Sequence, residues 1–357
     1  MPSFINPIPP YSTGAAPLFC YKIVYRFRWH FAIVCGILLL PYSGKRPTKG
    51  RAEGETIMPY FATHHIFAAT VRRVTGESAA RIADAYPAGY RWGAQGADLL
   101  AYYHAPLPDP LARLARRLHA VPAGELFEAL CEAAVQRHDT AALAYVFGFC
   151  THYALDRVTH AFLEAQADRL ALFQPGYSAA ARRRMVENDI DSVMIANYVS
   201  AAPASFEAFR LLDPHAAECT VAARVLADAA QQVCGAHLPP AAVYRAMHDM
   251  RRMLHLTHNG GHLRGRLVRF ERLTGRAGWA SSLLRPAEPH AADCANRTHR
   301  PWHADGEERT DSFFDLFDAA VPLAVSLQRA VLERYYQAKP LDPRFFPTDF
   351  YGKPIKN

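Results

Sequence analysis

One stretch of the sequence constrains the fold more than any other, because metal-ligand residues recur at helical spacing within a predicted helix over residues 139–165. His152, Asp156 and His160 follow one another every four residues. On an α-helix each such step advances about 6 Å and turns by about 40°, so the three side chains form one stripe. Apolar neighbours such as Phe149 indicate a buried helix, where an aspartate without a partner is costly. The stripe predicts a buried metal site; the alternative is an amphipathic helix whose polar face carries histidine.

The composition favours an all-α chain. Alanine, leucine and arginine dominate the 357 residues, and alternating runs of valine, isoleucine and threonine are few. Half of the residues are hydrophobic, which is enough for a substantial core. We therefore expect a single multi-helix bundle of about ten helices around a buried metal cluster, with almost no sheet. The predicted helices cover residues 63–75, 78–86, 109–119, 124–136, 139–165, 178–200, 203–211, 215–234, 240–256 and 311–337.

Three segments are expected along the chain. Residues 1–57 form an N-terminal extension, either disordered or due to a wrongly assigned start, and are followed by a helical domain over 58–340 and a tail over 341–357. The extension places basic residues before an apolar run, 31–40, which resembles a signal peptide but is shorter than the roughly 20 residues that span a bilayer. We expect no transmembrane anchor in the helical domain.

The cysteines indicate the cellular compartment, and the distribution of charge indicates the class of partner. The seven cysteines include no CxxC pair, which favours a reducing, cytoplasmic location; a genuine signal peptide in residues 1–57 would instead make the protein secreted. The net charge of +7 is scattered in short groups such as Arg182-Arg183-Arg184. Nucleic-acid-binding proteins usually concentrate such charge in a stripe with aromatic residues. The pattern argues against nucleic acid and favours small anionic substrates such as phosphates.

Two other predicted helices carry candidate ligands. Thr63 is a candidate N-cap, which places His64 and His65 in the first helical turn, where one of them can reach inward but not both. Glu187 lies on the helix after the histidine stripe and could complete a second metal site. The alternative for Glu187 is an ordinary ion pair with Arg183, four residues earlier.

A glycine-rich loop offers a further carboxylate. Gly93 and Gly96 allow the backbone to approach another segment closely, and Asp98 lies two residues after Gly96. His119 ends the next predicted helix. These two candidates have plain alternatives, since aspartate stabilises turns and histidine is favourable at a helix C-terminus.

Together these residues resemble the bacterial zinc-dependent phospholipase C family, which shares a helical trinuclear zinc fold with the P1-type nucleases. The resemblance covers roughly residues 58–337 and is a pattern of several segments. The similar segments are Met58-Pro-Tyr-Phe-Ala-Thr-His64, Gly93-Ala-Gln-Gly-Ala-Asp98, Leu118-His119, Gly148-Phe-Cys-Thr-His152-Tyr-Ala-Leu-Asp156 with His160, the run from Glu187 to Asp191, Asn296-Arg-Thr-His299-Arg-Pro-Trp302 and Asp311-Ser-Phe-Phe-Asp-Leu-Phe.

The resemblance implies a cluster of zinc ions. It assigns one ion to Asp98, His119, His152 and Asp156, a second to His160 and Glu187, and a third to His64 with Asp156. At one position the chain departs from the family, which has a histidine where this chain has Arg183. Two or three ions are therefore expected.

The resemblance also implies an activity, the hydrolysis of a phosphodiester by zinc-activated water. The substrate would be a phospholipid headgroup or, in the cytoplasm, a soluble phosphodiester. Asp98 would double as the general base. His299 and Trp302 would shape the substrate cleft, unless they only pack a loop. The alternatives are a P1-type nuclease and a catalytically degenerate metal-binding protein, for which Arg183 is the evidence.

Overall fold

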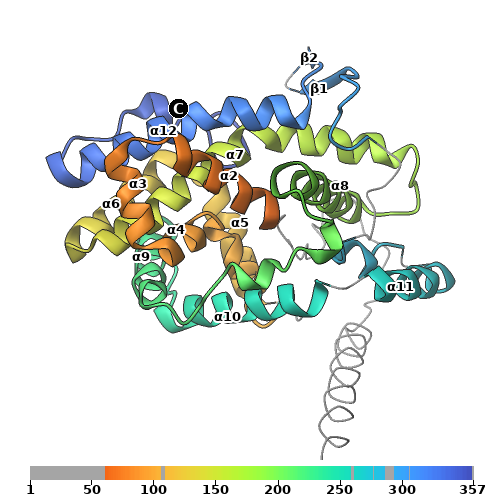
Figure 1. Ribbon diagram of the computed structural model, residues 1–357, viewed down its shortest axis with the longest axis horizontal. Helices are drawn as coiled ribbons and strands as arrows, with labels where there is room; N and C mark the ends of the chain where they lie inside the picture. Colours follow the sequence, from red (N-terminus) through yellow and green to blue (C-terminus); the bar gives the residue numbers. More distant parts are fainter. Residues whose placement is uncertain are drawn as a thin grey trace, which may run out of the picture. The chain divides into compact units, whose positions relative to one another are not determined.

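The computed structural model describes residues 61–105, 109–258, 261–275, 277–285, 293–304 and 306–355 (Figure 1). Its α-helices are α2 (Phe61–Val74), α3 (Glu77–Ala85), α4 (Pro87–Gly93), α5 (Pro110–Ala120), α6 (Ala123–Arg137), α7 (Thr140–Ala171), α8 (Ala179–Met194), α9 (Ala217–Cys234), α10 (Pro240–Thr257), α11 (Gly261–Thr274) and α12 (Phe313–Gln337). The strands β1 (Trp302–Ala304) and β2 (Glu307–Arg309) form an antiparallel pair. The chain is all-α, as predicted. The expected N-terminal extension lies outside the described residues.

The central helix of the bundle is α7. It packs against α12, α4, α8 and α6, and Figure 1 shows α12 running beside it. Asp139 caps its N-terminus by accepting the backbone N–H of Ala141 at 2.8 Å. Every residue from Ala141 to Leu155 is buried, so this part of the helix lies inside the core on all sides. The predicted histidine stripe therefore starts in the core and ends on a more exposed turn.

Two glycines bring α4 and α7 into backbone contact. A Cβ atom at Gly93 would overlap the carbonyl oxygen of Tyr145, and one at Gly148 would overlap that of Tyr90. Larger residues would separate the two helices. The contact leads the next segment, the 3-10 helix η1 (Gly96–Tyr102), over α7, where a Cβ at Gly96 would overlap the ring of His152.

Several elements differ from the expected ranges. Residues 87–102, which none of the predicted helices covers, form α4 and η1, and Pro87 starts α4 at a position where proline is favourable. Helix α11 was not predicted. The helix expected over 203–211 is wrong, because the structure has two 3-10 turns there, Pro203–Ser205 and Ala208–Arg210. None of the helices in the described ranges has the length and apolar character needed to cross a bilayer.

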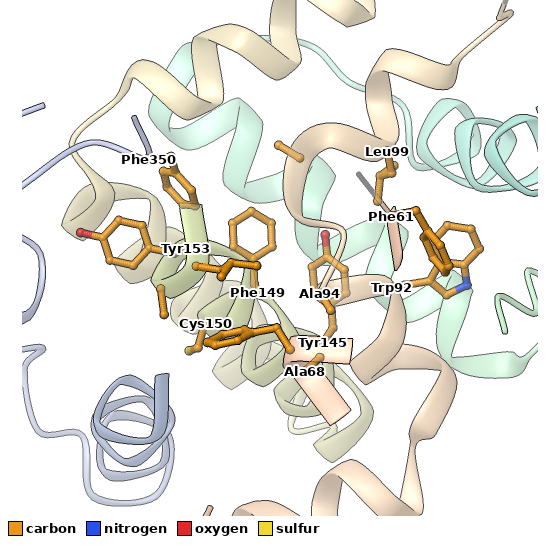
Figure 2. Packing of buried hydrophobic residues seen from close by; sticks show 14 of the residues in the cluster. Phe61, Ala68, Trp92, Ala94, Leu99, Tyr145, Phe149, Cys150, Tyr153 and Phe350 are labelled. Carbon is orange, nitrogen blue, oxygen red and sulfur yellow. The ribbon is translucent and has the colours of Figure 1, made fainter. Parts of the chain in front are cut away.

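The segment after residue 340, which we expected to be a tail, contributes to the core as far as it is described. The ring of Phe350 lies 4.8 Å from that of Tyr153 and 5.8 Å from that of Phe149, measured between centroids (Figure 2). The backbone N–H of Phe350 donates to the carbonyl oxygen of His119 at 3.1 Å. This segment thereby holds the neighbouring Tyr351 beside the predicted ligands.

Candidate metal centre

Four of the predicted ligands converge between α5, η1 and α7. Nε2 of His119 lies 3.1 Å from Nε2 of His152 and 3.3 Å from Oδ1 of Asp98. Oδ2 of Asp156 lies 3.3 Å from Nε2 of His152 and 3.8 Å from Nε2 of His119. Tetrahedral ligands at zinc-like bond lengths are about 3.3 Å apart. These four side chains are therefore spaced to surround one small ion.

His64 approaches the same aspartate from α2. Its Nε2 lies 3.3 Å from Oδ1 of Asp156, so one carboxylate oxygen faces His64 and the other faces His119 and His152. Ligand atoms of His64, Asp98, His152 and Asp156 all lie within 4.8 Å of one another, so this buried group could hold a metal ion. Asp156 has the placement of a bridging carboxylate.

Only one histidine of the first pair reaches this group, as the sequence indicated. The ring of His64 lies 4.5 Å from that of His152, measured between centroids. The ring of His65 instead stacks on Phe61 with centroids 5.9 Å apart. His65 is therefore part of the packing of α2.

The orientation of His119 favours a cation. Its Nδ1 lies 2.8 Å from the carbonyl oxygen of Ala115 and donates to it, so Nε2 is the nitrogen that faces Asp98 and Asp156. A metal-bound histidine typically has its second nitrogen held in this way. An uncharged Nε2 beside carboxylate oxygens is unfavourable unless positive charge, from a proton or a metal ion, lies between them.

The pKa values of Asp98, His152, His64 and Asp156 shift in different directions. Burial raises the pKa of Asp98 to about 6 and lowers that of His152 well below its ordinary value. Burial opposes the charged forms of His64 and Asp156 too, but their mutual attraction helps to outweigh it, so the pKa of His64 is raised and that of Asp156 is lowered. Metal binding needs neutral imidazoles and ionised carboxylates, a state that an ion would stabilise here.

The start of α2 is held by a residue to which the sequence assigned no role. Thr63 is not the N-cap, because α2 already includes Phe61. Instead the buried Asp191 of α8 accepts the backbone N–H groups of Ala62 and Thr63 at 3.1 and 2.8 Å, and the Thr63 hydroxyl at 2.7 Å. Arg285 donates to the same carboxylate at 3.1 Å. Asp191 thus positions the helix turn that carries the histidine ligand.

The two residues assigned to a second ion are bridged by Arg183. Its Nε donates to Oε1 of Glu187 at 2.7 Å, and its terminal nitrogen donates to Nδ1 of His160 at 3.2 Å. Nε2 of His160 lies 2.9 Å from Oε1 of Glu164, so both ring nitrogens have partners. Burial raises the pKa of Glu187 to about 7, with Arg183 limiting the rise. The ion pair that the sequence left as an alternative is formed.

A cavity of about 440 Å³ opens beside both groups, within the size range of small-molecule sites. Its lining includes acidic, basic and aromatic side chains. These residues are Asp98, Arg116, His119, Asp156, His160, Glu164, Asp168, Arg183, Arg184, Glu187, Tyr351 and Lys353. The ring centroid of Tyr351, which the sequence did not single out, lies 4.8 Å from that of His160 and 5.8 Å from that of His119.

The two residues expected to bind substrate do not line this cavity. Trp302 is buried, packs edge-on against Phe162 with centroids 5.3 Å apart, and donates from Nε1 to the carbonyl oxygen of Asp311 at 3.0 Å. Nδ1 of His299 lies 3.1 Å from the carbonyl oxygen of Thr310 on the exposed side. These contacts match the loop-packing alternative.

Comparison of the chain with protein-family models, with curated proteins and with solved structures yields no match. The resemblance to zinc-dependent phospholipases C therefore stays a prediction from the residue pattern.

Proposed function

We propose that this chain is a zinc-dependent phosphodiester hydrolase of the phospholipase C type. The proposal rests on four side chains that converge beside the cavity, those of Asp98, His119, His152 and Asp156. Histidine and carboxylate in this proportion suit zinc. A bound zinc ion would polarise a phosphoryl oxygen and lower the pKa of water.

The chain's own residues have distinct roles in this proposal. Asp98, His119, His152 and Asp156 hold one ion, and His64 shares Asp156 in holding another. Asp98 also lines the cavity, so its carboxylate is placed to accept a proton from water there. Oδ1 of Asp98 lies 3.3 Å from Nε2 of His119, so in this proposal Oδ2 would be the oxygen that takes the proton from water.

The substrate is an anionic phosphodiester. Arg116, Arg184 and Lys353 contribute positive charge to the lining of the cavity. A space of about 440 Å³ suits a headgroup and its phosphate, so the acyl chains of a phospholipid would stay outside. A soluble phosphodiester would use the same charges.

Metal content and turnover test the proposal on the same samples. Zinc per chain is measured by mass spectrometry, and hydrolysis is followed with a chromogenic phosphodiester, for the full chain and for a His152→Ala/Asp156→Ala variant. We expect zinc and activity in the parent chain and the loss of both in the variant. His299→Ala, which changes a histidine outside the cavity, is the matched control and should keep both.

One observation favours a second candidate, a metal-binding protein without turnover. Arg183 stands between the residues assigned to the second ion, so the centre departs from the trinuclear pattern. Bound zinc that is lost in the double variant, without hydrolysis of any phosphodiester tested, would support this candidate. A parent chain that binds no zinc would overturn both.

A further inference from the structure

We propose that the guanidinium of Arg183 takes the place of the second ion, so that the centre binds one ion fewer than the resemblance implies and uses the arginine as a fixed cation facing the substrate. This inference rests on the proposed function, because it concerns the same cavity. Arg183 would then carry permanently the positive charge that a dissociable ion carries in the pattern implied by the resemblance.

The partners of Arg183 are those that a metal ion would have. The guanidinium bonds to a carboxylate oxygen of Glu187 at 2.7 Å and to an imidazole nitrogen of His160 at 3.2 Å. The other nitrogen of His160 is held by Glu164 at 2.9 Å, the support that metal-bound histidines typically have. A guanidinium only donates hydrogen bonds, so Nδ1 of His160 must be the acceptor and Nε2–H the donor to Glu164. His160 and Glu187 thus both direct acceptor atoms at one cation, and that cation is the guanidinium of Arg183.

An ordinary ion pair along one helix does not explain these contacts. Such a pair joins residues four apart on α8, which accounts for Glu187 alone. His160 lies on α7, 23 residues earlier in the chain. The neighbouring Arg184 has a different environment, with its Nε donating to the hydroxyl of Ser282 at 3.0 Å. Arg183 is the arginine that joins the two helices at the candidate ligands.

The position of Arg183 also gives it access to an anionic ligand. Its side chain is 21% exposed and lines the cavity together with Asp98 and Asp156 of the metal centre. Guanidinium groups bind phosphate oxygens through charge-assisted hydrogen bonds and stay protonated at any physiological pH. A phosphate that reaches the metal centre would therefore also meet Arg183.

Two substitutions of the full chain separate the metal count from the anion contact. Arg183→His supplies a third metal ligand beside His160 and Glu187, and Arg183→Met removes the charge without supplying one. After dialysis against zinc and removal of the excess, we expect Arg183→His to hold one zinc ion more per chain than the parent. Arg183→Met should hold the same number as the parent. Arg184→His, the same substitution at the next residue of α8, is the matched control and should gain none.

Inorganic phosphate serves as the anionic probe, measured by titration calorimetry on the zinc-loaded proteins. Arg183→Met should weaken phosphate binding about tenfold, and Arg183→His should restore most of the affinity through its additional ion. A residue that only stabilised the helix pair would leave phosphate binding unchanged when variants of equal fold content are compared by circular dichroism.

The outcomes distinguish this inference from the proposed function. Zinc in the parent chain with no gain in a folded Arg183→His variant would overturn the inference alone. If Arg183→His fails to fold, unchanged phosphate affinity in Arg183→Met would overturn it. Absence of zinc from every variant would overturn the proposed function and the inference together.

Discussion

The histidine stripe on α7 has a buried end, His152 with Asp156, and a more exposed outer end, His160. Imidazole and carboxylate groups come together at both ends, but with different neighbours. At the buried end, imidazole nitrogens of His119 and His152 face carboxylate oxygens of Asp98 and Asp156. At the outer end, Arg183 bonds both to the imidazole of His160 and to the carboxylate of Glu187. Spacing along one helix therefore predicts where positive charge is favourable, whereas the facing helix decides whether a side chain such as Arg183 already lies there.

The largest expected effect is at the shared carboxylate of the buried end. Asp156→Asn keeps the shape of the side chain but removes the charge that faces His64 on one side and His119 and His152 on the other. We expect zinc affinity to fall by more than about 100-fold, because losing a residue that only supports a metal ligand already costs about 10–100-fold and Asp156 would touch the ion itself. Competition with a chromogenic chelator measures this. Retention of all the zinc would mean that the buried end is not the metal site.

The second largest effect is expected in how the stability of the metal-free protein depends on pH. The pKa of Asp98 is about 6 in the folded protein and near 3.8 in the unfolded chain, so the folded state binds more protons between these values. This carboxyl therefore contributes stability at low pH that is lost as the pH rises from about 4 to 6, by about 3 kcal/mol. Asp98→Asn should remove that part of the pH dependence.

Urea unfolding of the metal-free parent and of Asp98→Asn, at several pH values between 4 and 7, measures the difference. The variant should gain stability relative to the parent as the pH rises. Added zinc should reverse the order above pH 6, because only the parent then offers an ionised ligand at this position. A constant difference across the range would show that Asp98 has an ordinary pKa.

The smallest effect is expected at the outer end. Glu187→Gln retains an oxygen that can accept from Nε of Arg183, and the pair is partly exposed, so the free energy of unfolding should fall by only about 1 kcal/mol. The zinc content should not change, in contrast to Asp156→Asn. Urea unfolding and metal analysis on one preparation measure both. The loss of one zinc ion per chain would place an ion, and not Arg183, at this end.

Much of the fold could be predicted, because α-helices leave a local signature. The apolar period and the flanking breaks located most of the helices, and the all-α class is confirmed. The glycines of the loop before Asp98 indicated a close backbone contact, and the structure has it between Gly93 and Tyr145. The helix α11 was not predicted, although Leu263, Leu267 and Phe270 recur at helical spacing within it.

The parts of the site that could not be predicted depend on contacts between distant segments. No local pattern links Asp191 to the backbone of Thr63, 128 residues earlier. Tyr351 was overlooked because its segment has little regular structure and was assigned to a tail. For Arg183 the sequence offered the ion pair with Glu187, but the bond to His160 depends on how α7 and α8 pack. Local patterns identified the ligand types, and tertiary packing decided their partners.

The anchoring of α2 by Asp191 has a consequence for exchange kinetics. His64 can reach Asp156 only when a chain loop of 128 residues has closed and α8 is in place to hold Thr63. Contacts over such a separation form late in folding. An ion held between His64 and Asp156 would therefore lose a ligand when the first turn of α2 opens. Its residence time would report the local opening of that turn rather than the intrinsic lability of the metal–ligand bonds.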